Sequence, residues 1–273
     1  HREEIAIAPF RKFFNLNEVK ENYPEVVENR IRQAKSVEIC DKLDGSMQSV
    51  RWYNDEVLMC GSMSLSKENS WRLQGGYSML SENHINMIKN NPNLTFIFEY
   101  ISLKDAHVVS YDKKDEGLYL IGIRDITNGY EFSYAEIENY SKQYNVSMPK
   151  LENGKTLDDL VYLSKVYKSE NKEGWVINID GHKIKIKCDD YVKIHRILDR
   201  VSSVNVVIEA VADDKYDDLI SKVPITHKTR IDNIAKQLFE YKSKANREVD
   251  ELFNQAQENT NNTKDFMIYV NNL

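Results

Sequence analysis

A lysine followed by a tight acidic turn, Lys42-Leu43-Asp44-Gly45-Ser46, has the residue types needed for nucleophilic attack on phosphorus. An amine attacks only in its neutral form, which is rare at pH 7 for a side chain whose ordinary pKa is about 10.4. Cations and divalent metal beside the lysine would disfavour the ammonium form and expose the lone pair. Asp-Gly-Ser is also the sequence of an ordinary turn, so this segment alone is a weak signal.

Four further segments, in a fixed order along the chain, supply the other groups that phosphoryl chemistry needs. One apolar strand carries an acid at Glu99, and a later strand opens on a second acid, Glu173. Lys183, Lys185 and Lys187 alternate with period two and therefore share one face of a strand. Phosphoryl and nucleotidyl transfer depend mostly on positioning and charge neutralisation, which these groups can provide. The four segments are residues 96–100, 118–124, 173–177 and 183–187.

The ordered set of segments resembles the covalent nucleotidyltransferases, the superfamily of polynucleotide ligases and mRNA capping enzymes. Within this superfamily the chain is similar to the family of bacteriophage T4 RNA ligase 1. Ser46 follows the Asp-Gly pair at a position where DNA ligases and capping enzymes usually carry arginine. Residues 9–18 and 185–191 also follow the family's pattern, and the resemblance is clearest over residues 8–195.

The resemblance implies a role for each reactive group. Lys42 would become covalently adenylated, and Lys185 and Lys187 would contact the α-phosphate and the leaving group of ATP. Glu99 and Glu173 would hold Mg²⁺ through its bound waters, because Mg²⁺ keeps most of its hydration shell. Mn²⁺ would be able to substitute. The residues alone leave another interpretation open, in which the lysines and acids are simply the solvated face of their strands.

The resemblance also implies contacts at the edges of the ATP site. Asp44 and Lys12 would contact ATP, with Lys12 meeting its outer phosphates, and Ile121 and Val176 would form an apolar slot for adenine. Asp213 lies where the family can hold a second metal near the pyrophosphate. The alternatives are a surface lysine at Lys12, core packing for the two aliphatic residues and a helix N-cap at Asp213.

Two departures from the family's pattern are visible. The segment Met59-Cys60-Gly61-Ser62-Met63-Ser64 lacks the base that the family tends to carry before its Gly-Ser pair. A phosphate contact is therefore missing, or has moved to a residue such as Lys67. The arginine-glycine pair that the family carries upstream of Phe13-Phe14-Asn15 is also not found. Since the chain begins at His1 without a methionine, we expect it to be incomplete at the front.

Size and composition limit the class of protein. A chain of 273 residues, 41% hydrophobic and 29% charged, has the composition of a soluble globular protein with one large or two smaller domains. The sequence contains neither an apolar run long enough to cross a bilayer nor a visible signal peptide. Cys40, Cys60 and Cys188 are odd in number and lack metal spacing, as expected of reduced thiols packed in strands. We therefore expect a cytoplasmic protein, acting in the host cytoplasm if it is phage-encoded.

The net charge of −6 argues against coating nucleic acid by bulk charge, but not against a local basic groove.

Hydrophobic patterning predicts an α+β protein. The resemblance implies an antiparallel-sheet nucleotidyltransferase domain over residues 1–196. Helical spacing predicts an all-α domain over residues 197–273, which contain no glycine. The Asp180-Gly181 pair predicts a hairpin turn. The predicted strands are residues 37–40, 47–53, 56–65, 94–101, 108–111, 118–124, 175–179 and 183–187. The predicted helices before the tail are residues 25–35, 81–89, 134–143 and 157–167.

Together with the reactive residues, the resemblance implies an ATP-dependent RNA ligase that joins a 5′-phosphate to a 3′-hydroxyl through a lysyl-AMP intermediate and an adenylated RNA 5′ end. We expect a monomer that repairs RNA, with tRNA as one candidate substrate and an end-healing kinase or phosphatase as a candidate partner. A DNA ligase or an mRNA capping enzyme is the alternative. Both usually carry a β-barrel domain after the last lysine segment, whereas helices are predicted in residues 197–273 of this chain. A nucleotide-binding module without activity would have lost the lysine or the acids, and none is lost.

Overall fold

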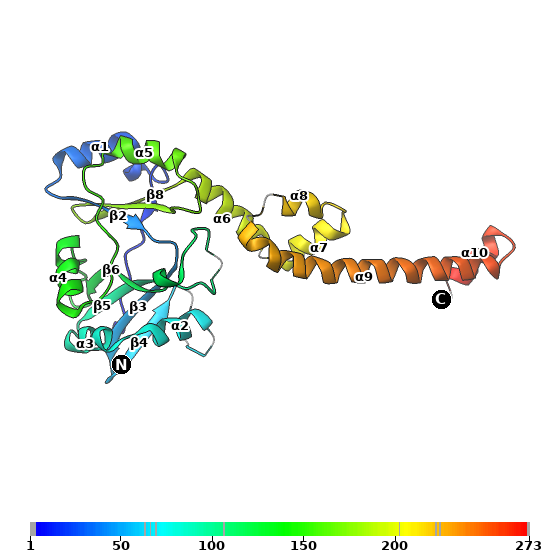
Figure 1. The fold of residues 1–273 in the computed structure, drawn as a ribbon, viewed down its shortest axis with the longest axis horizontal. Coiled ribbons are helices and arrows are strands. Elements are labelled where there is room, and N and C mark those ends of the chain that lie inside the picture. Colours follow the sequence, from blue (N-terminus) through cyan, green and yellow to red (C-terminus); the bar gives the residue numbers. More distant parts are fainter. Residues whose placement is uncertain are drawn as a thin grey trace. The chain divides into compact units, whose positions relative to one another are not determined.

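The computed structural model describes residues 4–271 except 63, 66, 69, 106, 202, 222 and 224. The chain divides into two compact units, His1–Lys193 and Ile194–Leu273. The first unit is a mixed α/β structure with largely antiparallel sheets, and every element described after it is a helix (Figure 1).

One sheet of the first unit carries three of the predicted site segments. Its strand order is β1-β8-β7-β2, and every pair is antiparallel except β1 with β8. The predicted hairpin at Asp180-Gly181 is confirmed, because β7 and β8 pair directly on either side of it. The four strands are β1 (Phe14–Asn15), β2 (Val37–Lys42), β7 (Gly174–Ile179) and β8 (His182–Lys187).

The other sheet is wholly antiparallel, with strand order β4-β3-β5-β6. Asn54 and Asp55 both adopt positive φ in the turn between β3 and β4, as a tight two-residue hairpin requires. The strand predicted over residues 56–65 ends at Gly61. The four strands are β3 (Ser46–Tyr53), β4 (Glu56–Gly61), β5 (Leu94–Ile101) and β6 (Gly117–Asp125).

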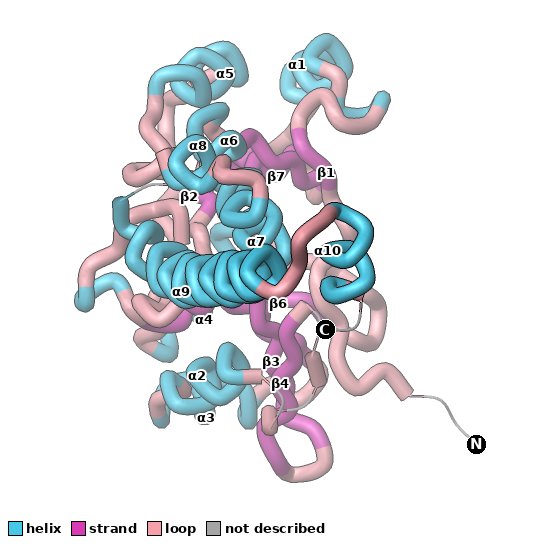
Figure 2. The backbone as a smooth tube through the Cα atoms, turned by 90° about the vertical axis from the view of Figure 1, so that its right-hand side faces the viewer, coloured by secondary structure: helices cyan, strands magenta, loops and turns pink. Residues whose placement is uncertain are grey.

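Helices cover the outer faces of both sheets, and the strands lie between them (Figure 2). On the β1-β8-β7-β2 sheet, Val27 of α1 and Leu160 of α5 pack in one core with Trp175 and Ile184. On the other sheet, α2, α3 and α4 contribute to a core centred on Phe96 and Leu120. The covering helices are α1 (Pro24–Gln33), α2 (Trp71–Met79), α3 (Glu82–Asn90), α4 (Tyr134–Tyr144) and α5 (Leu157–Val166). Two short 3₁₀ turns, η1 (Lys20–Asn22) and η2 (Lys113–Asp115), complete the unit.

Helix α2 has no counterpart among the predicted elements. Its sequence contains Gly75 and Gly76, and glycine inside a helix is destabilising by about 1 kcal/mol relative to alanine. A Cβ on Gly75 would come within 2.2 Å of the Tyr100 hydroxyl, and a Cβ on Gly76 would come within 1.7 Å of the Gln48 side chain. The close approach of α2 to the sheet therefore requires glycine at both positions. Because glycine disfavours a helix, the sequence pattern did not predict α2.

The second unit is built from helices around a small aliphatic core. Val201, Val207, Val211 and Ile231 are buried together in it. None of the described helices, long α9 included, is apolar enough over sufficient length to span a membrane. The helices are α6 (Asp189–Val201), which begins in the first unit, α7 (Val204–Ala212), α8 (Tyr216–Ile220), α9 (Ile225–Glu258) and α10 (Thr263–Val270).

Candidate active site

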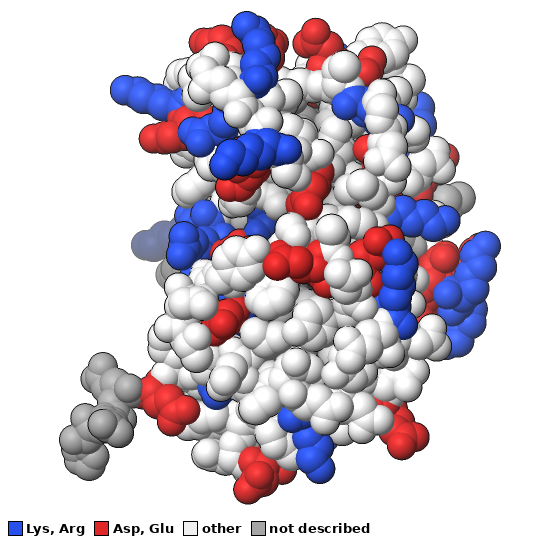
Figure 3. Space-filling model, turned by 90° about the vertical axis from the view of Figure 1, so that its left-hand side faces the viewer, with Lys and Arg blue, Asp and Glu red and all other residues white. Residues whose placement is uncertain are grey.

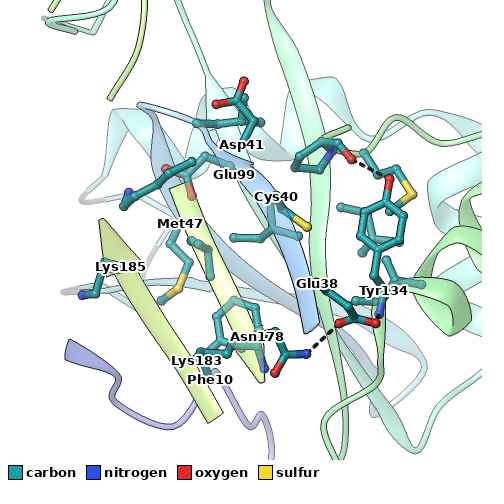
Figure 4. A pocket seen from close by; sticks show the side chains of 18 of the residues that line it. Phe10, Glu38, Cys40, Asp41, Met47, Glu99, Tyr134, Asn178, Lys183 and Lys185 are labelled. Atoms are coloured by element: carbon teal, nitrogen blue, oxygen red, sulfur yellow. Dashed lines mark hydrogen bonds between the residues drawn. The ribbon is translucent and has the colours of Figure 1, made fainter. Parts of the chain in front are cut away.

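A cavity of about 340 Å³ lies in the first unit, with walls from both sheets. Lys42 and Glu99 line it together with Lys185, and the two aliphatic residues expected to hold adenine, Ile121 and Val176, line it as well. Figure 4 shows Lys185 and Glu99 on one side of the cavity and a second polar group around Glu38 and Asn178 on another. The sequence therefore identified residues that the fold brings to one cavity.

Strand register explains why Lys42, Glu173 and Lys187 meet. Gly174 pairs with Lys42 on one side and with Lys187 on the other, so Glu173, one residue earlier, lies between the two lysines. The Nζ of Lys42 lies 2.9 Å from Oε2 of Glu173, and the Nζ of Lys187 lies 2.9 Å from Oε1. The Glu173 side chain is only 3% exposed. One buried carboxylate thus holds two lysines.

Gly174 makes this register achievable. Its φ of +151° is one that residues with side chains rarely adopt, and an added Cβ would lie 2.0 Å from the carbonyl oxygen of Ile186. Lys172, two residues earlier, ties the same strand opening to its surroundings. Its Nζ lies 2.8 Å from Asp41 and 2.7 Å from Glu152. The residues on either side of Glu173, Lys172 and Gly174, therefore both restrict the position of the start of β7.

The charges of this cluster are strongly coupled. Burial by itself would lower the pKa of Lys42, but Glu173 and Glu99 outweigh it, so the pKa is raised and the ammonium form is favoured. Burial raises the pKa of Glu99 to about 7, although Lys42 acts in the opposite direction. The pKa of Lys185 is lowered by burial and by the nearby lysines. Without further cations, the two acids therefore favour the ammonium form of Lys42.

Asp44, which was expected to contact ATP, binds several groups of the protein in this structure. It is buried, and its carboxylate accepts hydrogen bonds from the backbone amides of Val108 (2.8 Å) and Val109 (3.0 Å) and from the Tyr191 hydroxyl (2.9 Å). Its own amide donates to the Tyr111 hydroxyl at 2.8 Å. The strand predicted over residues 108–111 is wrong, because these amides bind a side chain instead of a neighbouring strand. Asp44 thus joins this loop to the turn that follows Lys42.

Two other expected ATP contacts lie outside the cavity lining. Lys12 is exposed, and its Nζ lies 5.0 Å from the centre of the Phe14 ring. Lys67, considered as a replacement for the missing base, has its Nζ 4.7 Å from the centre of the Tyr77 ring. Within the segment that lacks the base, Met63 falls outside the described residues.

Asp213 belongs to the second unit. It follows the last residue of α7, and its Oδ2 lies 3.2 Å from Lys215, in a pair whose side chains are both more than 60% exposed. The alternative of a helix N-cap is wrong, because Asp213 stands at the carboxyl end of α7. Its proposed part in binding a second metal receives no support from its surroundings within this unit.

The donor set around Lys42 fits a hydrated cation better than a directly ligated one. Among the described residues, no three His, Cys, Asp or Glu side chains lie close enough to hold a metal ion. Glu99 and Glu173 nevertheless both act on the charge of Lys42, so two carboxylates face one small region. Such a pair suits Mg²⁺, which keeps several of its waters.

The fold and this lysine–carboxylate cluster define a nucleotidyltransferase domain of the ligase kind. The sequence profile of a family described as RNA ligase matches residues 1–191, and the chain belongs to this family, that of T4 RNA ligase 1-like proteins. Comparison with curated protein sequences returned no match.

Solved structures of the Naegleria gruberi RNA ligase share the fold. A lysine-to-alanine mutant with ATP and Mn superposes with a TM-score of 0.55 at 18% identity, over 71% of this chain and 61% of that chain. The same ligase with PPi gives a TM-score of 0.54 at 19% identity, over the same shares of the two chains. A lysine-to-methionine mutant with AMP and Mn gives 0.55 at 20% identity, again over 71% and 61%. This chain therefore matches about three fifths of the length of that ligase.

Proposed function

We propose that this protein is an ATP-dependent RNA ligase that joins a 5′-phosphate to a 3′-hydroxyl. One observation carries the proposal. The buried carboxylate of Glu173 bridges Lys42 and Lys187, and Lys42 lines the same cavity as Ile121 and Val176. Nucleophile, charge and apolar slot therefore lie together, as nucleotidyl transfer needs.

In the first step, the neutral Nζ of Lys42 attacks the α-phosphorus of ATP. A phosphorus–nitrogen bond forms, the bond from the α-phosphorus to the bridging oxygen breaks, and pyrophosphate leaves with that bonding pair. Lys185 and Lys187 would neutralise charge on the phosphate oxygens. The pKa of Lys185 is lowered first by burial and then by its neighbours Lys42 and Lys187.

Glu99 and Glu173 would hold a hydrated Mg²⁺, with Mn²⁺ as a substitute. When bound, the metal supplies positive charge that competes with Lys42 for the two carboxylates and stabilises the phosphates. We therefore expect the first step to depend on such a cation, because in its absence Glu173 and Glu99 raise the pKa of Lys42.

In the later steps, an oxygen of the RNA 5′-phosphate would displace Lys42 from AMP, and the RNA 3′-hydroxyl would then displace AMP and close the strand. Recognition of the RNA needs local cations rather than bulk charge, since the chain carries a net charge of −6. On the face shown in Figure 3, lysines and arginines are interspersed with acids rather than gathered in one patch. We assign RNA positioning to the all-α region, residues 197–273.

The cellular setting that we propose follows from this chemistry. The ligase would act as a monomer in a cytoplasm, including that of a phage-infected host. It would act on RNA, with tRNA as a candidate, after a kinase or phosphatase has restored the 5′-phosphate and 3′-hydroxyl that sealing requires.

The test is a sealing assay with matched substrates. The protein is incubated with nicked duplexes whose 5′-phosphorylated strand is RNA or DNA, with ATP or GTP, and with Mg²⁺. We expect the RNA strand to be joined with ATP. Preferential sealing of DNA, or transfer of GMP to an RNA 5′ end, would instead support the DNA ligase or capping alternatives.

A further inference from the structure

A second acid, Glu38, lies in the same cavity as the reactive lysine. It is on β2, four residues before Lys42, and both residues line the cavity. Side chains on a strand alternate between faces, so Glu38, Cys40 and Lys42 point to the same side. With a rise of about 3.3 Å per residue, the Cα atoms of Glu38 and Lys42 are about 13 Å apart. A nucleotide joined to Lys42 through its phosphorus would extend its base along β2 toward Glu38.

The carboxylate of Glu38 is held in a fixed orientation. Its Oε1 accepts a hydrogen bond from the Tyr134 backbone amide at 2.9 Å, and its Oε2 accepts one from Nδ2 of Asn178 at 2.7 Å (Figure 4). The Oδ1 of Asn178 accepts from the Gly181 amide at 3.0 Å, which sets the direction of the Asn178 amide. A carboxylate offers about four acceptor sites, so each oxygen of Glu38 retains capacity for another donor.

The neighbouring polar groups at this end of the cavity are already engaged. The Tyr134 hydroxyl donates to the Pro149 carbonyl at 3.0 Å, and Lys183 is paired with Glu131. Among the described residues, none of the Lys, Arg or His side chains lies within ion-pair distance of Glu38. Ile137 and Met148 add apolar wall. Glu38 is therefore an oriented acceptor, without a counter-charge, in a largely apolar slot.

We propose that Glu38 reads the exocyclic 6-amino group of adenine and so determines the preference for ATP; this inference rests on the proposed function of the cavity. An ionised carboxylate only accepts hydrogen bonds, and the 6-amino group is the donor that adenine presents on the edge remote from the ribose. Guanine places an acceptor oxygen at that position. A purine that lacks the amino group would leave Glu38 facing a C–H group, and sites built to bind a donor reject analogues that lack it.

The experiment compares two nucleotides that differ only in this group. Formation of the covalent lysyl–nucleotide adduct is followed with ATP and with purine riboside triphosphate, which lacks the 6-amino group. For the wild-type chain we expect kcat/KM to favour ATP by about 10- to 100-fold, the range for a hydrogen bond to a charged group. Glu38→Ala should reduce this preference to within about threefold, mostly by lowering the value for ATP.

Two further variants distinguish recognition of the base by Glu38 from a purely structural role of Glu38. Asn178→Ala breaks one hydrogen bond to Glu38 but keeps the carboxylate, so it should retain a clear preference for ATP even if its absolute rate falls. Glu38→Gln keeps the shape of the side chain and should weaken the preference. It also serves as the test if the alanine variant does not fold, as judged by circular dichroism.

The outcomes distinguish this inference from the function on which it rests. An unchanged nucleotide preference in Glu38→Gln and Glu38→Ala, in protein that still forms the ATP adduct, would overturn the role of Glu38. Equal use of GTP by the wild-type chain, lost in Glu38→Ala, would mean that the carboxylate reads the donors of guanine, which also overturns the assignment. Failure of the wild-type chain to form any adduct would contradict the proposed function instead.

Discussion

The two units of the chain differ in how deeply their ion-paired side chains are buried. In the first unit, Glu173 is 3% exposed and is bridged by Lys42 and Lys187. In the second unit, charged pairs such as Lys244–Glu248 have both side chains at least 60% exposed, around a core of aliphatic residues. Exposed pairs contribute about 0–1 kcal/mol, whereas removing one partner of a buried pair costs about 3–5 kcal/mol. The buried carboxylate shared by two lysines therefore distinguishes the first unit, where we expect the reaction to take place.

The largest effect expected from this contrast concerns Glu173. The variant Glu173→Gln lacks the charge that bridges both lysines. It also lacks one of the two carboxylates that we propose hold the hydrated metal. The rate of lysyl-AMP formation should fall by about 10²-fold or more, as is usual when a group that stabilises transition-state charge is lost. Single-turnover labelling with ATP measures this rate. The matched control is Glu248→Gln on α9, which should label at the wild-type rate; equal rates for both variants would erase the distinction between the units.

Glu99 makes a prediction about pH. Burial raises its pKa to about 7, so between about pH 4.5 and pH 7 the folded protein holds a proton that the unfolded chain has released. Through this group the free energy of unfolding falls as pH rises across that window, by up to about 3 kcal/mol. Glu99→Gln removes this penalty, so the ligand-free variant should gain stability over wild type at pH 8 but not at pH 4.5.

Urea unfolding of both proteins at the two pH values measures that difference. Adenylation by Glu99→Gln should be slow at pH 8, because the variant loses a carboxylate that acts on Lys42 and that we propose holds the hydrated metal. A variant that is stabilised and also fully active would show that Glu99 has no part in the reaction.

Part of this cluster could be predicted because its information is local. The period-two lysines of β8 and the Asp180-Gly181 turn determine the β7–β8 register, and that register brings Glu173 to Lys187. The groups that the sequence did not reveal depend on contacts between distant residues. Asp44 binds the amide of Val108 and the hydroxyl of Tyr191, which are 64 and 147 residues away in the chain.

Glu38 and α2 were missed for related reasons. The cavity position of Glu38 depends on Tyr134 and Asn178, and an acid at the start of a strand gives no signal of such partners. The glycines of α2 oppose a helix locally and make sense only when the helix lies against the sheet. Local patterns thus predicted most of the strands, whereas the contacts that fix the residues around Lys42 required the fold.

Removal of residues 202–273 tests the contrast at the level of whole units. The first unit contains the cavity, so AMP transfer to Lys42 should be affected less than sealing of a nicked or hairpin RNA. Circular dichroism checks that the remainder is folded. In the full chain, Asp213→Ala should change the adenylation rate by no more than about threefold, because it breaks only an exposed ion pair. A severe defect in this point variant would link the second unit to the ATP site.

The smallest effect is expected on the exposed part of α9. Val249 is 64% exposed, whereas Val207 of the same unit is fully buried. Val249→Ala should change the free energy of unfolding by about 0.5 kcal/mol or less, and Val207→Ala should cost more because it leaves a cavity. Thermal unfolding of the pair measures the difference. Equal destabilisation would mean that Val249 is covered in solution.

The central claim is that Lys42 is the residue that takes AMP from ATP. The direct measurement is mass spectrometry of the protein after incubation with ATP and Mg²⁺ but without RNA, followed by peptide mapping. We predict one added AMP on Lys42, stable to base and labile to acid as a phosphoramidate, and none in Lys42→Ala. An adduct on another residue, or one that persists in Lys42→Ala, would contradict the account.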